Sequence, residues 1–270
     1  MFSINMSFKR WTLFFCFFAG GCSQSRQPRY LFGGDYCGQT IADVDVWPRI
    51  SGGRNVSEGE MPWMVRLNVS FLDDNKETCG GFILNENWVI TAAHCLSRVV
   101  SVRASAGRIS YDWISNNEQV MVIPNSNFYL HPQHNELTME NDIGLIHMPQ
   151  SLRFNQYVKP ICVHDVSSCD VEPPGNSNQV DFCLSNITSA GWGLAGAAGS
   201  VSNYLKAVDM KIVPRDQCQR QYPPSRILPQ HICAKGQQPG GDTCPGDSGG
   251  LYFQNQKAVA VGIISFGPHG

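Results

Sequence analysis

A serine flanked by glycines near the end of the chain constrains this sequence more than any other feature. Residues 246–250 read GDSGG, which places Ser248 among small residues and next to Asp247. A serine hydroxyl is a weak nucleophile, so it needs a base to take its proton and backbone donors to hold the oxyanion that forms. Gly246 lets the backbone turn sharply and leaves the N–H groups of Gly246 and Ser248 free to converge. The motif predicts nucleophilic chemistry at Ser248, although a plain surface turn also fits these residue types.

The order of groups along the chain separates two kinds of serine hydrolase. Residues 246–250 also fit the G-x-S-x-G turn of α/β-hydrolases, in which an acid and then a histidine follow the serine. Here no Asp or Glu follows Asp247, and the one later histidine is His269, beside the last residue. The base and the acid are therefore expected before Ser248.

Two upstream segments supply candidates for these groups. Residues 88–95 (WVITAAHC) are an apolar, β-branched run that ends in His94, as expected of a strand that carries an imidazole at its end. Residues 141–146 (NDIGLI) place Asp142 immediately before an apolar run. Asp142 is either a turn residue or a buried acceptor that fixes the histidine tautomer. For His94, a structural role in the core or a loop is the alternative.

The His94, Asp142 and Ser248 motifs, in that order, resemble those of the chymotrypsin-like (trypsin family) serine proteases. The resemblance runs from about Cys37 to the last residue. It implies that His94 deprotonates Ser248, that Asp142 orients His94, and that the N–H groups of Gly246 and Ser248 hold the oxyanion. No metal or cofactor is expected, because His131 and His134 have no ligand cluster beside them and are interpreted as loop residues.

The resemblance also implies an all-β fold of two six-stranded antiparallel β-barrels with the site between them. The barrels are expected at about 50–150 and 163–270, joined by a crossover at 151–161. Strand and turn patterns dominate the sequence, and long helical periodicity is missing. Strands are expected at 64–69, 81–84, 88–91, 119–123, 143–147, 207–213 and 258–265.

The N-terminal segment predicts export from the cell. Lys9 and Arg10 precede an apolar run at 11–20 and then small residues, so residues 1–22 are interpreted as a secretory signal peptide. The apolar run is too short to span a bilayer. We expect a secreted, extracellular protein with a propeptide at 23–49 and a protease domain at 50–270.

Residues 49–53 (RISGG) resemble the activation junction of the family. Cleavage after Arg49 would free the amine of Ile50, which in the family pairs with the carboxylate beside the nucleophile, here Asp247. Breaking a buried pair of opposite charges from one side costs about 3–5 kcal/mol, which is enough to act as a switch. The chain is therefore expected to be a zymogen, and a trypsin-like protease is its expected activator.

Asp242, six residues before Ser248, stands where the trypsin-like branch has the floor of its primary specificity pocket. A carboxylate there selects Arg or Lys through charge-assisted hydrogen bonds. A solvated loop aspartate is the alternative. Ser265, Phe266 and Gly267 resemble the strand that forms one pocket wall and binds substrate backbone. Protein or peptide substrates are expected, with serpin or Kunitz-type inhibitors as further partners.

The sequence has 11 cysteines, which is usual where disulfides persist. By position in the family, the resemblance implies three disulfides, Cys79–Cys95, Cys218–Cys233 and Cys37–Cys162. A local Cys169–Cys183 bridge is expected as a fourth. Cys244 is left without a partner. Members of the family continue beyond the position that corresponds to Gly267. We therefore expect a C-terminally truncated chain with an incomplete second barrel and little activity. A catalytically silent homologue that acts by protein binding is the alternative function.

Charge excludes two classes of partner. The formal net charge is −2 and no Lys/Arg run occurs, so the sequence has no basic segment that would bind nucleic acid or an anionic membrane. Three Asn-x-Ser/Thr tripeptides begin at Asn55, Asn68 and Asn186 and are candidate glycosylation sites in a secreted chain.

Overall fold

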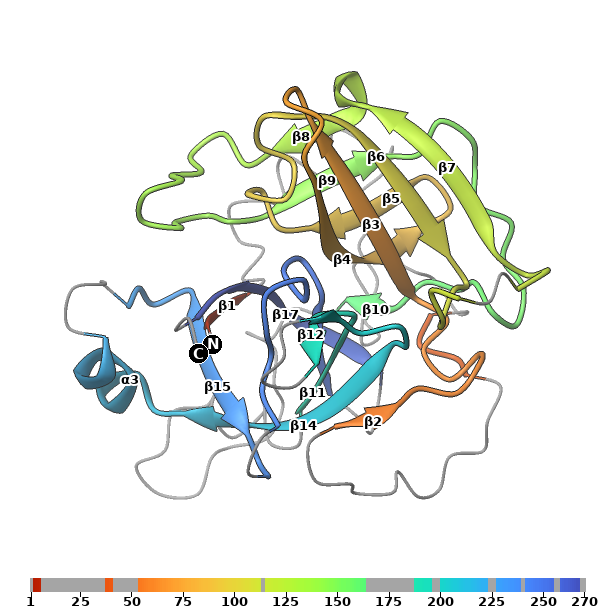
Figure 1. Ribbon diagram of the computed structural model, residues 1–270. Coiled ribbons are helices and arrows are strands. Elements are labelled where there is room, and N and C mark those ends of the chain that lie inside the picture. The colour runs from red at the N-terminus through yellow and green to blue at the C-terminus, as the bar shows by residue number, and fades with distance from the viewer. Residues whose placement is uncertain are drawn as a thin grey trace, which may run out of the picture.

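The computed structural model describes most of the chain after residue 53 and two short segments before it. The described residues are 2–5, 37–40, 53–112, 115–163, 187–195, 200–222, 227–238, 241–254 and 258–267. They form a mostly β structure in which two groups of strands lie one above the other (Figure 1). No helix in these ranges has the length and apolar character needed to cross a membrane.

The first sheet contains seven antiparallel strands in the order β7-β6-β3-β4-β5-β9-β8. Their bounds are β3 (Met64–Phe71), β4 (Lys76–Asn85), β5 (Trp88–Thr91), β6 (Val99–Ala106), β7 (Gln119–Pro124), β8 (Phe128–Leu130) and β9 (Gly144–His147). Six strands are expected from the sequence. The seventh, β8, arises because the chain makes a short 3-10 turn at Asn125–Asn127 and then pairs with β9.

The second sheet closes into a ring of six strands, β1-β15-β14-β11-β16-β17, because β1 also pairs with β17. Two short strands, β2 and β10, attach to β14 and β17, and β10 is the parallel one. A small β12–β13 ribbon and the helix α3 complete the second half. The bounds are β1 (Phe2–Asn5), β2 (Arg54–Asn55), β10 (Cys162–Val163), β11 (Ile187–Gly191), β12 (Leu194–Ala195), β13 (Ser200–Val201), β14 (Lys206–Val213), α3 (Arg215–Gln221), β15 (His231–Gly236), β16 (Leu251–Gln254) and β17 (Val259–Phe266).

The truncation prediction implies an open strand edge at β17, and in the structure β1 pairs with this strand. Strand β1 lies between β15 and β17, and Ile4 pairs with His231 on one side and with Ile263 on the other. An unpaired strand edge exposes a row of backbone donors and acceptors, and β1 satisfies them here. Strand β1 lies within the expected signal peptide. A chain from which residues 1–22 have been removed therefore cannot form this pairing.

The largest hydrophobic cluster of the described residues spans both sheets. Trp63, just before β3, packs edge-on against Phe253 of β16 with ring centroids 5.6 Å apart. Both side chains are almost completely buried. This packing holds β4 of the first sheet beside the segment that precedes β16, where Ser248 lies.

Three disulfides are formed between the described residues, and they are pairs that the family resemblance implies. They join Cys37 to Cys162, Cys79 to Cys95, and Cys218 to Cys233. Cys169 and Cys183 lie outside the described residues, as do Arg49, Ile50 and Asn186. Cys244 carries a free thiol.

Candidate active site

The pairing of β5 with β9 brings His94 and Asp142 together. Thr91, the last residue of β5, pairs with Gly144, the first residue of β9. His94 follows Thr91 by three residues and Asp142 precedes Gly144 by two, so both lie at the same end of this strand pair. His94 Nδ1 lies 2.7 Å from Asp142 Oδ2, and the His94 backbone N–H donates to Asp142 Oδ1 at 2.8 Å.

The Asp142 carboxylate is completely buried and receives a third donor. The Ser265 hydroxyl at the end of β17 donates to Asp142 Oδ2 at 2.5 Å. Burial by itself would raise the pKa of Asp142, but the hydrogen bond and charge of His94, with the Ser265 hydroxyl, hold that pKa below its usual value. An ionised Asp142 places the histidine proton on Nδ1 and leaves the Nε2 lone pair free to act as a base. Sequence analysis assigned Ser265 to the substrate pocket and missed this contact.

The nucleophile segment is held between the two sheets. The Gly80 N–H on β4 donates to the Ser248 carbonyl at 2.7 Å, and the Gly249 N–H donates to the Ile264 carbonyl at 2.8 Å. Gly249 has a φ of 76°, and a Cβ there would lie 2.1 Å from the Thr91 hydroxyl oxygen. Only glycine fits both the backbone conformation and the space.

Two backbone donors beside the nucleophile are available to a ligand. Gly246 has a φ of 95°, which sets a sharp turn just before Asp247. Across the described ranges, the N–H groups of Gly246 and Ser248 make no hydrogen bond. N–H groups that are free to donate beside a serine hydroxyl are one requirement for stabilising an oxyanion.

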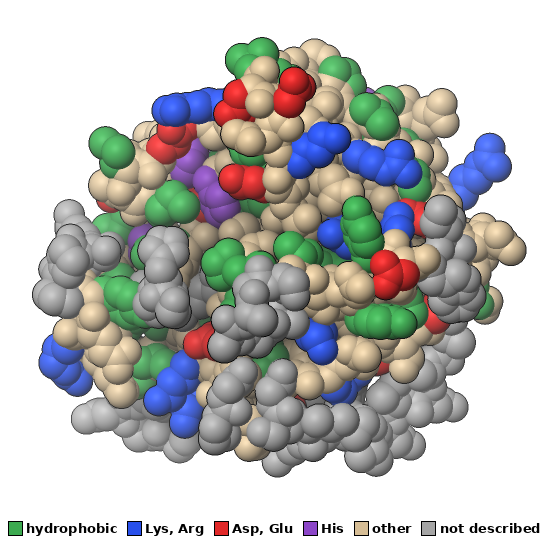
Figure 2. Space-filling model, in the orientation of Figure 1, with side chains coloured by type: hydrophobic (Ala, Val, Ile, Leu, Met, Phe, Trp, Pro, Cys, Tyr) green, Lys and Arg blue, Asp and Glu red, His purple; other side chains and the backbone are tan. Residues whose placement is uncertain are grey.

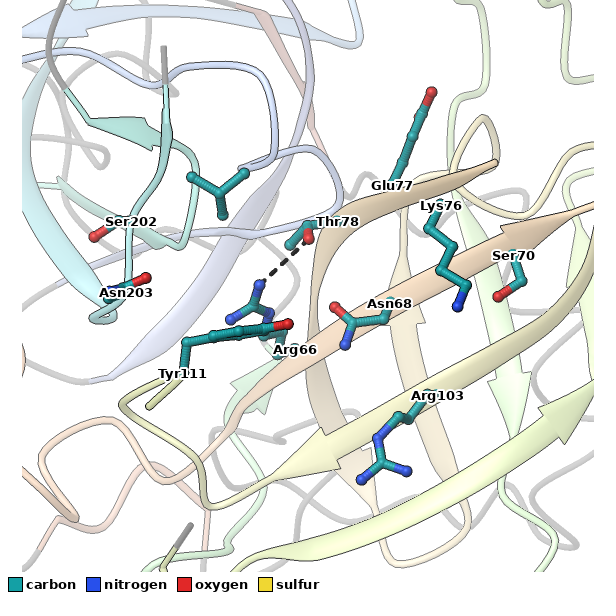
Figure 3. A pocket seen from close by; sticks show the side chains of 11 residues that line it. Arg66, Asn68, Ser70, Lys76, Glu77, Thr78, Arg103, Tyr111, Ser202 and Asn203 are labelled. Atoms are coloured by element: carbon teal, nitrogen blue, oxygen red, sulfur yellow. Dashed lines mark hydrogen bonds between the residues drawn. The ribbon is translucent and has the colours of Figure 1, made fainter. Parts of the chain in front are cut away.

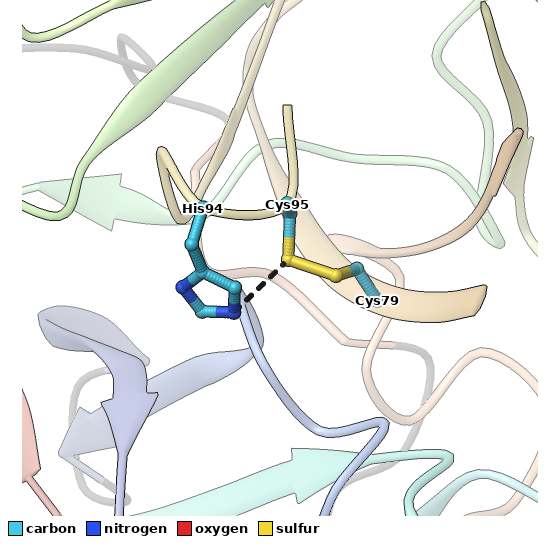
Figure 4. A group of neighbouring side chains, drawn as sticks. All are labelled: Cys79, His94 and Cys95. Carbon is cyan, nitrogen blue, oxygen red and sulfur yellow. Dashed lines mark hydrogen bonds between the residues drawn. A yellow bond between two sulfur atoms is a disulfide. The ribbon is translucent and has the colours of Figure 1, made fainter. Parts of the chain in front are cut away.

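The contact between the histidine and the serine is not formed. His94 Nε2 lies 3.7 Å from Cys95 Sγ, and Figure 4 shows the ring turned toward the disulfide. Because Cys95 is bonded to Cys79, it has no S–H to donate, and these three residues offer no thiolate pair for a metal. Ser248 Oγ has no hydrogen bond to any described residue. Such contacts are often long without substrate and tighten when it binds.

The sequence model of the family described as Trypsin matches residues 50–270. This chain belongs to the trypsin family. Serine proteinase stubble of Drosophila melanogaster is 31% identical over 232 residues, covering 81% of this chain and 28% of the relative. Ovochymase-2 of Mus musculus is 31% identical over 247 residues, covering 86% of this chain and 38% of the relative.

A third relative carries a name that bears on activity. Inactive CLIP domain-containing serine protease A8 of Anopheles gambiae is 28% identical over 239 residues, covering 81% of this chain and 61% of the relative. The chain thus spans less than two thirds of the length of these curated relatives. The solved structure titled HL collagenase superposes with a TM-score of 0.66 at 25% identity and covers 81% of this chain and 87% of its own.

In this trypsin-family chain, the Asp247 carboxylate is enclosed without a cation beside it in the described ranges. Its oxygens accept the N–H groups of Gly193 at 2.6 Å and Cys244 at 2.9 Å. A Cβ on Gly191 or Gly193 would lie 2.1 or 2.4 Å from these oxygens, so two glycines form the cradle. Burial raises the pKa of Asp247 to about 6, against the effect of the two N–H donors. Asp247 as a whole residue is half-buried.

The residues expected to bind substrate lie on two segments of the second sheet. Asp242 is exposed, and its Oδ1 accepts the Thr243 N–H at 2.8 Å. Phe266 is half-buried and packs edge-on against His231 with ring centroids 5.6 Å apart, and Gly267 follows it, also half-buried. A carboxylate at the floor of a narrow pocket would be covered, so the specificity role of Asp242 stays a prediction.

Proposed function

We propose that this trypsin-family chain is a secreted serine endopeptidase that is made as a zymogen. The observation that carries the proposal is the His94–Asp142 pair, at 2.7 Å, combined with the unpaired N–H groups of Gly246 and Ser248 beside the nucleophile. These are the base, its orienting acid, the nucleophile and the oxyanion donors that acyl transfer needs.

In the proposed reaction, Ser248 Oγ attacks the carbonyl carbon of the scissile bond while its proton moves to His94 Nε2. The buried Asp142 carboxylate stabilises the imidazolium that forms. The carbonyl oxygen takes the negative charge and accepts the N–H groups of Gly246 and Ser248. His94 then returns its proton to the leaving amine, and a water molecule hydrolyses the acyl-enzyme by the same steps.

The zymogen part of the proposal rests on Asp247. In the uncut chain Ile50 is bonded to Arg49 and has no free amine. The Asp247 carboxylate is then an enclosed charge whose pKa stands at about 6. An ammonium group released by cleavage after Arg49 would be the missing counter-charge, and its insertion would fix the backbone that carries Gly246 and Ser248.

Cleavage after Arg or Lys is proposed from the position of Asp242. A substrate guanidinium or ammonium group would pair with this carboxylate through charge-assisted hydrogen bonds. In protein cut at Arg49, Asp242→Ser should lose most turnover of Arg and Lys substrates while Ser248 stays reactive. An unchanged preference for basic residues would remove the assignment of Asp242.

The proposed function is tested by turnover of peptide amide substrates with Arg, Lys, Phe or Ala before the cleaved bond. Protein treated with trypsin should cleave the Arg and Lys peptides, and Arg49→Gln protein treated in the same way should not. Ser248→Ala, cut at Arg49, is the matched control for residual trypsin. Equal activity of the Arg49→Gln and native proteins would contradict the zymogen proposal.

A catalytically silent binding protein is the second candidate function. The missing contact between Ser248 Oγ and His94 Nε2 favours it, as does the relative named as inactive. Under this alternative, the protein cut at Arg49 would show no more turnover than Ser248→Ala, whichever residue precedes the cleaved bond.

A further inference from the structure

A polar groove of about 510 Å³ lies on the first sheet, and none of its lining residues belongs to the candidate catalytic set. It is formed by β3, β4 and β6, with Tyr111 and the segment after β13 on its far side (Figure 3). Its charged lining residues are Arg66, Lys76, Glu77 and Arg103. Figure 2 shows Lys and Arg side chains on the face that carries β3 and β6.

Arg66 is the unusual residue of this groove. It is only 4% exposed, yet its Nε and Nη1 have no hydrogen-bond partner among the described residues. Nη2 reaches the Thr78 hydroxyl at 3.4 Å, and the Tyr111 ring lies over the guanidinium at 4.5 Å. A buried cation with two nitrogens that have no acceptor is unfavourable, and an anion that entered the groove would satisfy them.

Arg108, which also contacts the Tyr111 ring, has hydrogen-bond acceptors of the kind that Arg66 lacks. Arg108 donates to Glu118 at 2.9 Å and to the Ser110 carbonyl at 2.8 Å, so a carboxylate and a carbonyl accept from it. Burial lowers the pKa of the Arg66 guanidinium, and the positive charge of Arg108 lowers it further. Arg66 therefore lies in a positive environment, and the Glu118 carboxylate beside Arg108 pairs with Arg108.

The remaining charges of the groove favour an anion as well. Arg66, Lys76 and Arg103 are positive and Glu77 is the one acidic lining residue, which leaves an excess of positive charge in a chain whose formal net charge is −2. Figure 3 shows Glu77 pointing away from the other labelled side chains. Lys76 and Arg103 are exposed and can approach an incoming ligand.

The groove and the nucleophile share strand β4. Thr78 lines the groove, and Gly80, two residues later, donates its N–H to the Ser248 carbonyl at 2.7 Å. At about 3.3 Å per residue, this part of the groove lies about 7 Å along β4 from the nucleophile segment. A polypeptide that binds at Ser248 and runs along β4 would reach Arg66 within two or three residues.

We propose that this groove binds an acidic side chain of a polypeptide substrate, whose carboxylate accepts hydrogen bonds from Arg66 once the Tyr111 ring moves aside. Lys76 and Arg103 attract the acidic segment, and Tyr111, which is 52% exposed, has room to move. The inference rests on the proposed protease function for the identity of the occupant, but the binding site itself does not require catalysis.

Binding is tested on the Ser248→Ala chain with fluorescein-labelled hexaglutamate, followed by fluorescence anisotropy at low and high NaCl. Hexaglutamine with the same label is the neutral probe. The protein is first treated with an endoglycosidase, because Asn68 lines the groove and begins an Asn-x-Ser tripeptide. Arg66→Gln should weaken hexaglutamate binding at least tenfold, and NaCl should weaken it in the native groove. Arg220→Gln, an exposed change on α3, is the charge-matched control and should stay within twofold.

Two further variants keep the proposal testable if Arg66→Gln does not fold. The exposed change Arg103→Gln should weaken hexaglutamate binding several-fold, and Tyr111→Ala should strengthen it by uncovering Arg66. Equal affinity for hexaglutamate and hexaglutamine would overturn the proposal, as would an equal loss in the Arg220→Gln control. Binding of heparin that depends on Arg66, with none of hexaglutamate, would replace the acidic peptide with a sulfated polysaccharide and overturn it too.

A kinetic experiment separates failure of the groove from failure of the proposed function. Peptides with one Arg are compared with Glu or Gln placed two or three residues to either side of it, using protein cut at Arg49. The Glu peptides on one side should have a kcat/KM at least tenfold higher, and Arg66→Gln should abolish this preference. Turnover without any preference for the Glu peptides would overturn the proposal for the groove and leave the protease proposal standing. Hexaglutamate binding without turnover of any peptide overturns the protease proposal alone.

Discussion

Ionisation of Asp247 should contribute a loss of stability to the uncut protein as the pH rises, and Asp247→Asn should remove this contribution. In the folded uncut chain, burial raises the pKa of Asp247 from 3.8 to about 6. A folded state that binds its proton more tightly than the unfolded state loses stability as the pH rises from about 4 to above 6. At about 1.36 kcal/mol per pKa unit, the loss is about 3 kcal/mol.

His231 works in the opposite direction over the same interval. Burial first, and then the charge of Arg215, lower the pKa of His231 from 6.5 to about 4. Its contribution to stability is present above pH 6.5 and is lost as the pH falls through about 4. The two groups therefore nearly cancel, and the stability of the uncut native chain should change little between pH 4 and pH 7.

The assay is urea unfolding of the Arg49→Gln chain at several pH values, with and without Asp247→Asn. The Asp247→Asn chain should gain about 3 kcal/mol in unfolding free energy between pH 4 and pH 7 relative to its parent, because the parent loses that amount as Asp247 ionises and the variant does not. The same substitution in protein cut at Arg49 should lower activity, because the new amine loses its carboxylate. Parallel pH profiles for the two uncut chains would refute the reasoning.

Three further predictions concern the residues around the site. Ser265→Ala should lower the unfolding free energy by about 1.5–3 kcal/mol, because the hydroxyl bonds the buried Asp142 carboxylate; Ser189→Ala, whose buried hydroxyl has no partner in the described ranges, is the control and should change it little in the same urea titration. Gly193→Ala should cost about 1–3 kcal/mol in that titration, because its Cβ would lie 2.4 Å from the carboxylate beside the nucleophile, and an unchanged midpoint would contradict this. Removal of residues 1–22 should lower the melting temperature by opening the strand edge that β1 covers, whereas equal melting of both chains would show that β1 adds no stability.

The sequence predicted those parts of the fold whose signal is local. Strands β3, β5 and β9 contain continuous or alternating apolar residues, and each appears close to its expected bounds. The strand β6 (VVSVRASA) was missed because serine, alanine and arginine interrupt its pattern. The helix α3 was also missed, since its seven residues bury one side chain, Cys218, and so carry no helical apolar stripe.

Features that depend on contacts between residues far apart in the sequence could not be predicted from local patterns. Ser265 reaches Asp142 across 123 residues, and no local pattern distinguishes that hydroxyl from any other serine on a strand. The groove around Arg66 needs two other strands and Tyr111 to come together, so an arginine in β3 gives no sign of it. The apolar runs marked His94 and Asp142 as candidates, but their juxtaposition was predictable only from the resemblance of their motifs to the family.

The central claim is that Ser248 becomes a reactive nucleophile when the chain is cut after Arg49. The most direct test is labelling with a fluorophosphonate, followed by mass spectrometry of the labelled peptide, before and after complete cleavage at that bond. Slow or undetectable labelling of the uncut chain, rapid labelling at Ser248 of the cut chain, and none in Ser248→Ala are predicted. Absence of label on Ser248 in fully cut, folded protein would contradict the account.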